Sequence, residues 1–408
     1  MQWAPSLGHQ AFRYFLIGHA FTTLGFWMQH AAVQWYVHQL TNSELWLGMI
    51  GVASSLPIVL FSMVGGALAD HYPKRRVLLT SQTIGLFVMI TFTATVWVEP
   101  ASVRPWTVLG FVSLLGTVRA FEIPTRQSFI VEMVGKSHLL SAIALNSAVF
   151  NGGRLVGPMI FGIVYFVADI PTCFLLYGLT FLAMPIALLM MKLPDERRGD
   201  PSHARHGEFF VGFRTIWADR RLLCLFFVLS LVLISGGAYL TLMPALTRKT
   251  LGLGEWGYST LLMCNGLGAL LGSIAVASLH RVESRRAMIL IGIALLGGGL
   301  TLLSFSTWLP VACVAMIITG TGWVAFLASA NSTIQLSVDD AIRGRVMSVW
   351  VLAFGLSNPT GAYLAGWIAS TIGTPTTIFF SGIACLAATL LSWRLLLRQS
   401  VEPPAEVS

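Results

Sequence analysis

Apolar runs of about 20 residues, the length that crosses a bilayer core as a helix, recur along nearly the whole chain. Backbone polar groups in lipid must be hydrogen-bonded internally, so these runs predict membrane-spanning helices. The runs at 179–191 and 287–303 lack the apolar and polar alternation of transmembrane strands, which argues against a barrel. The composition agrees, since 55% of the residues are hydrophobic and only 10% are charged.

The runs and the turn residues between them predict an all-α fold of twelve transmembrane helices in two sets of six. The first set covers residues 11–38, 46–69, 76–97, 106–124, 139–167 and 173–192. The second set covers residues 222–246, 257–279, 287–305, 309–332, 343–370 and 376–397. The expected parts are an N-terminal half (1–193), a central loop (194–219), a C-terminal half (220–398) and a tail (399–408).

The basic residues predict the orientation of these helices, because Lys and Arg concentrate in short loops that stay cytoplasmic. With both termini cytoplasmic, most of the 25 Lys and Arg residues fall in cytoplasmic segments, including Lys74, Arg75, Arg76 and Arg126. This asymmetry and anionic lipid account for the net charge of +8 without a nucleic-acid partner. The five cysteines are scattered singly, without metal-type spacing, so no metal or cofactor is expected.

The turn at 66–76 joins a small-residue helix end to one acid and three bases. Its pattern resembles the loop signature of the major facilitator superfamily, with Pro73 where a glycine is usual. That resemblance implies a monomeric carrier and a latch between its halves. In such a latch Asp70 would face the positive N-terminus of the eleventh helix, and Glu122 or Glu132 would pair with a base of the turn. The latch residues are Gly66, Asp70, Lys74 and Arg75.

A narrower resemblance covers the blocks 119–134, 142–147 and 151–158. These blocks are similar to the bacterial efflux branch of the superfamily that includes the enterobactin exporter and macrolide efflux proteins. Gly153, Gly157 and Pro158 also resemble a fifth-helix motif associated with antiporters. Taken alone, two glycines four residues apart indicate only close helix packing.

Polar residues at membrane depth are the candidate functional residues, because a charge in the hydrocarbon core costs about 2.5 kcal/mol or more unless it is paired or hydrated. Glu122 and Arg119 are spaced to pair on the fourth helix, and with His19 and His30 they are the candidates for proton coupling or gating. The alternative for each is a structural hydrogen bond or ion pair. The candidate cavity residues are Gln34, Asn146, Asn151, Arg154, Tyr239, Asn331 and Gln335.

The sign of the expected cavity favours one class of solute. Glu122 is the only acid at depth and lies near two arginines, so an anionic or neutral, oxygen-rich solute is favoured over a cationic drug. No nucleotide-binding loop of the form Gly-x-x-x-x-Gly-Lys-Ser/Thr is present, which leaves the proton gradient as the energy source.

The chain is therefore expected to be a secondary transporter of the bacterial inner membrane and not an enzyme. It would export a small organic solute by alternating access and proton antiport, with a carboxylate or catecholate siderophore as the first expectation. Drug or macrolide efflux is the alternative. A lipid flippase or a membrane protein that binds a ligand without transporting it is the alternative of another class.

Overall fold

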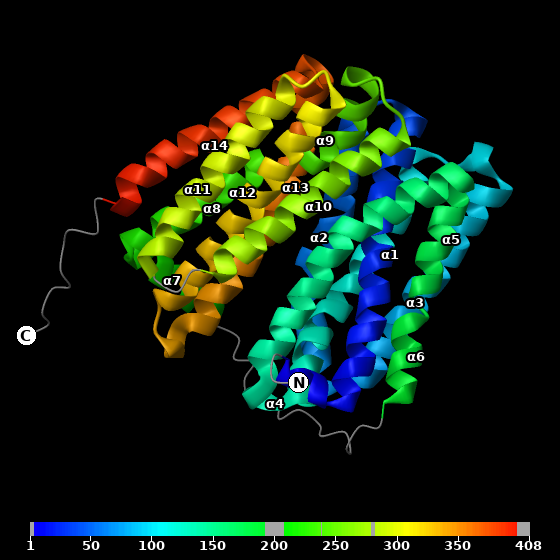
Figure 1. Cartoon of the computed structure of the whole chain (residues 1–408). Helices are drawn as coiled ribbons and strands as arrows, with labels where there is room; N and C mark the ends of the chain where they lie inside the picture. The colour runs from blue at the N-terminus through cyan, green and yellow to red at the C-terminus, as the bar shows by residue number, and fades with distance from the viewer. Residues whose placement is uncertain (1–3, 192–207, 238, 279–281, 398–408) are drawn as a thin grey trace, which may run out of the picture. The chain divides into compact units, whose positions relative to one another are not determined.

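The computed structural model describes residues 4–191, 208–237, 239–278 and 282–397, and the regular elements in these ranges are helices (Figure 1). The predicted all-α fold is confirmed for this part of the chain. The chain divides into two compact units. The first contains residues 1–204 and 252–266, and the second contains 205–251 and 267–408.

The first unit is built around two long helices, α1 and α4, that pack along each other (Figure 1). Helices α2 and α3 also pack on α4, and the beginning of α10 belongs to this unit. Its elements are η1 (Pro5–Gly8), α1 (Gln10–Thr41), α2 (Glu44–His71), α3 (Lys74–Val98), η2 (Pro100–Ser102), α4 (Pro105–Val167), α5 (Ile170–Thr180) and α6 (Ala183–Met190).

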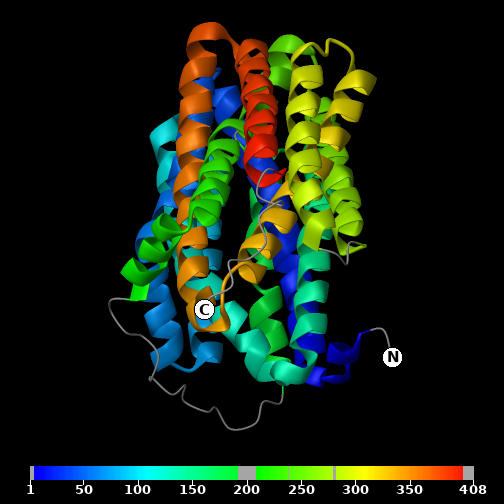
Figure 2. The same ribbon diagram turned by 90° about the vertical axis from the view of Figure 1, so that its left-hand side faces the viewer.

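In the second unit α11 packs along α12 and α14, and α13 packs against α8 (Figure 2). A short π-helical turn, Leu246–Thr250, follows α9. The elements that follow α6 in the chain are α7 (Glu208–Ala218), α8 (Arg220–Gly236), α9 (Tyr239–Ala245), α10 (Glu255–Ala277), α11 (Val282–Ser304), α12 (Leu309–Leu336), α13 (Asp340–Ile372) and α14 (Thr374–Leu397).

Ten helical segments of the described residues are long and apolar enough to cross a membrane. They include two arms of α4, a first arm (Pro105–Gly135) and a second arm (Ser137–Val167). The predicted first and eleventh helices form as α1 and α13, but their polar residues keep them out of these ten. Twelve spans with cytoplasmic termini therefore stay a prediction.

The first arm of α4 is longer than the sequence predicts. The expected end at residue 124 is wrong, because Pro124 lies inside the helix and the helix continues to Gly135, whose φ of 68° favours glycine. Apolar residues at helical spacing explain the extension, since they enter a buried core with α1, α3 and α6. The core includes Phe12, Phe15, Leu78, Phe129, Ile130, Met133, Val134, Met184 and Leu188.

The predicted central loop, 194–219, contains a helix in its described part. Helix α7 covers residues 208–218, and Ile216 on it is buried. Apolar residues three and four apart, including Phe209, Phe213 and Ile216, account for this helix. Residues 192–207 and the predicted tail, 399–408, lie outside the described residues.

The second arm of α4 approaches α1 closely at Gly157. A Cβ atom added at Gly157 would lie 2.5 Å from Trp27 Cβ and 2.9 Å from the backbone nitrogen of Met28. At Gly152, five residues earlier on the same helix, an added Cβ meets no atom within 4 Å. The close packing proposed for the glycine motif is therefore present at Gly157.

Substituting Gly157 by alanine is expected to destabilise the protein by about 1–3 kcal/mol, because the new methyl group overpacks the α1 backbone. The matched variant Gly152→Ala adds the same group to open space and should not lower stability. The measurement is the thermal unfolding midpoint of both variants in the same detergent. Equal midpoints for the two variants would contradict the packing argument.

Candidate functional site

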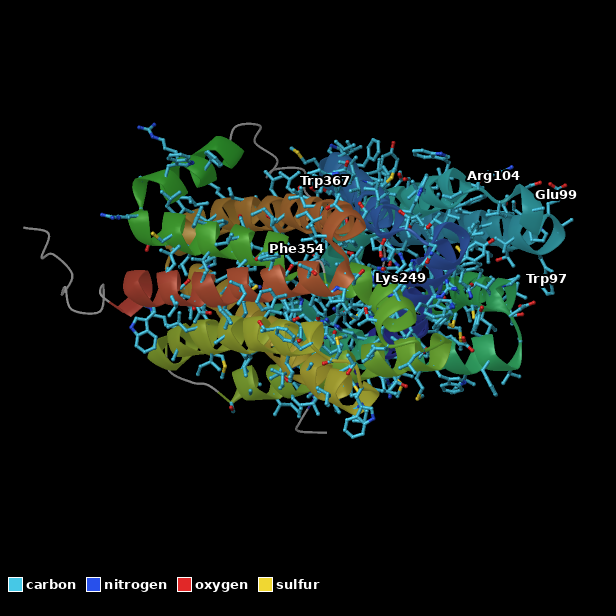
Figure 3. The ribbon with its side chains drawn as sticks, turned by 90° about the horizontal axis from the view of Figure 1, so that it is seen from above. Trp97, Glu99, Arg104, Lys249, Phe354 and Trp367 are labelled. Atoms are coloured by element: carbon cyan, nitrogen blue, oxygen red, sulfur yellow. The ribbon has the colours of Figure 1, made fainter. Side chains whose placement is uncertain are left out.

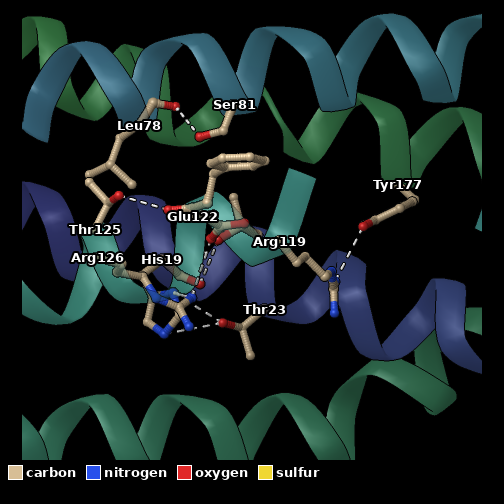
Figure 4. Close-up of polar contacts among 11 residues, drawn as sticks. His19, Thr23, Leu78, Ser81, Arg119, Glu122, Thr125, Arg126 and Tyr177 are labelled. Atoms are coloured by element: carbon tan, nitrogen blue, oxygen red, sulfur yellow. Dashed lines mark hydrogen bonds and ion pairs between the residues drawn. The ribbon is translucent and has the colours of Figure 1, made fainter. Parts of the chain in front are cut away.

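Four polar side chains from α1 and the first arm of α4 meet inside the first unit, and we name them the Glu122 cluster: His19, Thr23, Glu122 and Arg126 (Figure 4). Arg126 Nη1 lies 3.5 Å from Glu122 Oε1 and donates to His19 Nδ1 at 3.0 Å. Thr23 Oγ1 lies 3.3 Å from the same histidine nitrogen. His19 and Glu122 are buried, at 1% and 9% exposure. The cluster therefore holds a carboxylate, a guanidinium and an imidazole in one contact chain.

The expected pairing of Glu122 with Arg119 is not the one found, because the ion pair of Glu122 is with Arg126. Arg119 donates instead to the hydroxyl of Tyr177 on α5 at 3.4 Å, and its guanidinium carbon lies 3.7 Å from the Phe26 ring centroid. Figure 4 shows the Arg119 side chain extending toward Tyr177, away from Arg126. The extension of the first arm past Pro124 explains the difference, since it places Arg126 one helical turn after Glu122.

The other polar contacts of α1 form a second group, which we name the arginine cluster: Trp27, His30, Arg119, Arg154 and Asn265. Arg154, on the second arm of α4, donates to Asn265 Oδ1 on α10 at 2.6 Å. Its guanidinium carbon lies 5.6 Å from the Trp27 ring centroid, within cation–π range. Arg119 reaches the neighbouring ring, so the two arms of α4 bring two guanidinium groups to adjacent residues of α1.

The His30 ring lies next to the two aromatic rings that these guanidinium groups contact, those of Phe26 and Trp27. Its ring centroid is 5.8 Å from that of Trp27 and 6.0 Å from that of Phe26. Gln34, one turn further along α1, donates its amide to His30 Nε2 at 3.3 Å. The buried Oε1 of Gln34 accepts no hydrogen bond from the described residues. Gln34 thus keeps one buried acceptor to which no described residue donates.

The remaining candidate cavity residues have the following hydrogen bonds and burial. Asn151 donates to the backbone oxygen of Ser147 in its own helix, at 3.0 Å, and the buried Asn146 Oδ1 accepts no hydrogen bond from the described residues. In the second unit Gln335 donates to Asn331 at 3.0 Å along α12, and Tyr239 is buried at the start of α9. The hydrogen bonds of Asn151 and Gln335 thus lie within one helix each.

The residues of the predicted latch lie around the turn between α2 and α3. Lys74 forms an ion pair with Glu132 on the first arm of α4, one of the two acids that the sequence proposed for it. Asp70 is exposed near the end of α2. An added Cβ at Gly66 meets nothing within 4 Å, whereas one at Gly65 would lie 3.0 Å from Phe121 Cα. Gly65, and not Gly66, is thus the glycine at which α2 contacts α4 closely.

The sequence did not predict three contacts of this site, those of Arg126, Tyr177 and Asn265. Arg126 was assigned to a loop, although the apolar spacing of 129–134 was a readable helix signal. Tyr177 and Asn265 lie 58 and 111 residues from their arginine partners, and no local pattern predicts such contacts.

Comparisons with known proteins agree with this arrangement of helices. The sequence model described as "Transmembrane secretion effector", a group within the major facilitator superfamily, matches residues 1–406. The chain belongs to this family. The protein is therefore a multi-pass efflux transporter of the major facilitator type and not an enzyme, as the sequence predicted.

Several relatives of this chain match over most of their length. The staphyloferrin A transporter of Staphylococcus aureus is 26% identical, covering 93% of this chain and 94% of the relative. The multidrug efflux pump Tap of Mycolicibacterium fortuitum is 27% identical, covering 85% and 86%. The enterobactin exporter EntS of Shigella flexneri is 24% identical, covering 98% and 95%.

Solved structures show the same fold as this chain. The nucleoside transporter NupG gives a TM-score of 0.77 at 10% identity, covering 95% of this chain and 99% of that structure. A bacterial homologue of the human lysosomal transporter Spinster, in an inward-facing and unoccupied conformation, gives 0.71 at 15% identity, covering 97% and 98%.

Proposed function

We propose that this transporter exports a siderophore, of carboxylate or catecholate type, by alternating access in exchange for protons. The carrying observation is the charge of the two clusters in the first unit, which contain three arginines and one carboxylate. Arg126 pairs with that carboxylate, and Arg119 and Arg154 contact aromatic rings and polar side chains of the same unit, so their positive charge would attract negatively charged or oxygen-rich groups. Two of the relatives above are named for the siderophores staphyloferrin A and enterobactin, which supports this substrate class.

Glu122 is the proton acceptor of the proposed cycle. Its carboxylate is buried and pairs with a guanidinium that also contacts His19, so proton uptake at Glu122 removes the charge that holds Arg126. Proton loss restores the ion pair. Alternating exposure of Glu122 to the two sides of the membrane, with solute bound when the proton is absent, gives antiport. The protein works as a monomer in the bacterial inner membrane in this proposal.

Efflux of drugs, including macrolides, is the second candidate function. It is supported by the relative named as the multidrug pump Tap and by the aromatic residues Phe26 and Phe150, whose rings contact Trp27 of the arginine cluster. Broad apolar and aromatic surfaces suit solutes that share shape and not charge.

Deletion of the gene in its native bacterium separates these functions. Under iron limitation, the deletion strain is expected to lose one siderophore from the medium and to accumulate it in the cell, with unchanged drug sensitivity. The measurement is mass spectrometry of medium and cell extracts beside a drug susceptibility panel, with the wild-type gene restored as control.

Other outcomes of the deletion select another function. Unchanged metabolites with increased sensitivity to several drugs would contradict siderophore export and support drug efflux. A changed distribution of a lipid between leaflets would identify a flippase. Solute binding by the purified protein, without uptake into proteoliposomes, would identify a ligand-binding membrane protein that does not transport.

A further inference from the structure

A groove of about 430 Å³ lies between α2, α3 and the first arm of α4, all in the first unit. It follows α3 through residues four apart, from Arg76 to Thr80, Ile84 and Val88. Those residues span about 18 Å at the helical rise of 1.5 Å per residue, which is long enough to hold an acyl chain. Glu122 and Arg126 are not among the residues that line the groove. The groove is thus separate from the Glu122 cluster.

The wall of the groove is almost entirely apolar. Val77, Val88 and Phe121 line it, and the groove residues Ile84 and Leu114 are 48% and 52% exposed. Two hydroxyl groups of the wall already donate hydrogen bonds within their own helices, Ser81 Oγ to the backbone oxygen of Val77 at 2.7 Å and Thr117 Oγ1 to the backbone oxygen of Ser113 at 3.0 Å. In a multi-pass membrane protein such exposed apolar side chains face acyl chains and not water.

One end of the groove carries a positive charge. Arg76, at the beginning of α3, lines the groove and is exposed, and the exposed Tyr72 lies beside it in the lining. Arg75 and Lys74 precede Arg76, and Lys74 is paired with Glu132. A guanidinium group presents parallel donors that match a phosphate, and its charge attracts anionic lipid. The groove therefore combines a phosphate-binding group with an apolar channel of acyl-chain length.

We infer that this groove binds an anionic phospholipid of the bilayer, with the phosphate at Arg76 and one acyl chain along Ile84, Val88 and Leu114. The bound lipid would fill the groove between α3 and α4. One residue of the groove wall, Phe121, directly precedes Glu122 in the sequence. The inference does not rest on the identity of the exported solute. It assigns the bases of the α2–α3 turn a ligand besides the ion pair with Glu132.

Native mass spectrometry of the full chain in detergent, with added palmitoyl-oleoyl phosphatidylglycerol or phosphatidylcholine, tests this inference. Phosphatidylglycerol is expected to bind in preference to phosphatidylcholine. The variant Arg76→Gln should weaken phosphatidylglycerol binding about fivefold, the contribution of one base near anionic lipid. Arg13→Gln is the matched control, because Arg13 is exposed on α1 and does not line the groove.

Two further variants separate the site from general charge and from misfolding. Ile84→Trp fills the apolar channel and should lower the binding of phosphatidylglycerol while leaving all bases in place, and Arg76→Lys should bind more tightly than Arg76→Gln. Glycerol 3-phosphate, which has no acyl chain, should not bind. Equal losses in Arg76→Gln and Arg13→Gln, equal binding of the two lipids, or unchanged binding in a folded Ile84→Trp would each overturn the inference.

Discussion

Replacing Glu122 by glutamine is expected to abolish solute transport driven by a pH gradient while solute exchange across the membrane continues. Glutamine has nearly the shape of the carboxyl group and accepts a hydrogen bond from Arg126, but it cannot take up or release a proton. The measurement uses proteoliposomes, in which gradient-driven uptake should fall to the level of protein-free vesicles. Counterflow of labelled against unlabelled solute, which needs no proton, should persist.

The control for this variant is Glu99→Gln, because Glu99 is an exposed acid at the turn between α3 and α4 (Figure 3). It should keep gradient-driven transport. Since Glu122→Gln leaves the charge of Arg126 without its carboxylate partner, the variant is expected to be less stable. The double variant Glu122→Gln/Arg126→Met removes the unpaired charge and should remain uncoupled. Full gradient-driven transport in the folded Glu122→Gln protein would refute the assignment of Glu122.

The sequence predicted the helical fold well because apolar runs of bilayer length have few other structures open to them. It predicted the local neighbours on α4 less well, and Pro124 is the reason. A proline inside a helical pattern usually ends or kinks the helix. Here the helix continues past Pro124, because Phe129, Ile130, Met133 and Val134 pack into a buried core. Packing thus overrides the local signal and moves Arg126 from a loop to the side of Glu122.

The arginine cluster shows the other limit of sequence reasoning. The stripe of His19, Thr23, Trp27, His30 and Gln34 on α1 was readable from its spacing, and the structure brings its members to the two clusters. The arginines of the two clusters that contact α1 come from α4, and two of them also bond to residues of α5 and α10. No periodicity within one helix encodes such contacts between helices. Polarity at membrane depth therefore identifies candidate residues, while tertiary packing decides which of them meet.

Replacing Arg154 by methionine is expected to raise the KM for an anionic solute about 10- to 100-fold, because a hydrogen bond to a charged group is worth about 1.5–3 kcal/mol. The long apolar side chain of methionine preserves packing against Trp27. Arg154→Lys keeps the charge but not the planar set of donors, and should restore only part of the affinity. The measurement is the concentration dependence of counterflow, with Arg104→Met, an exposed arginine at the α3–α4 turn (Figure 3), as control.

Asn265→Asp distinguishes solute binding from a structural role for Arg154. The new carboxylate would stand 2.6 Å from the Arg154 guanidinium, at the position of the present Oδ1, and compete with an anionic solute for it. A binding role predicts a higher KM together with an unchanged or higher unfolding midpoint, because the internal ion pair replaces the solute. A purely structural role predicts the stability effect alone. An unchanged KM in both Asn265→Asp and Arg154→Met would therefore exclude Arg154 from the binding site.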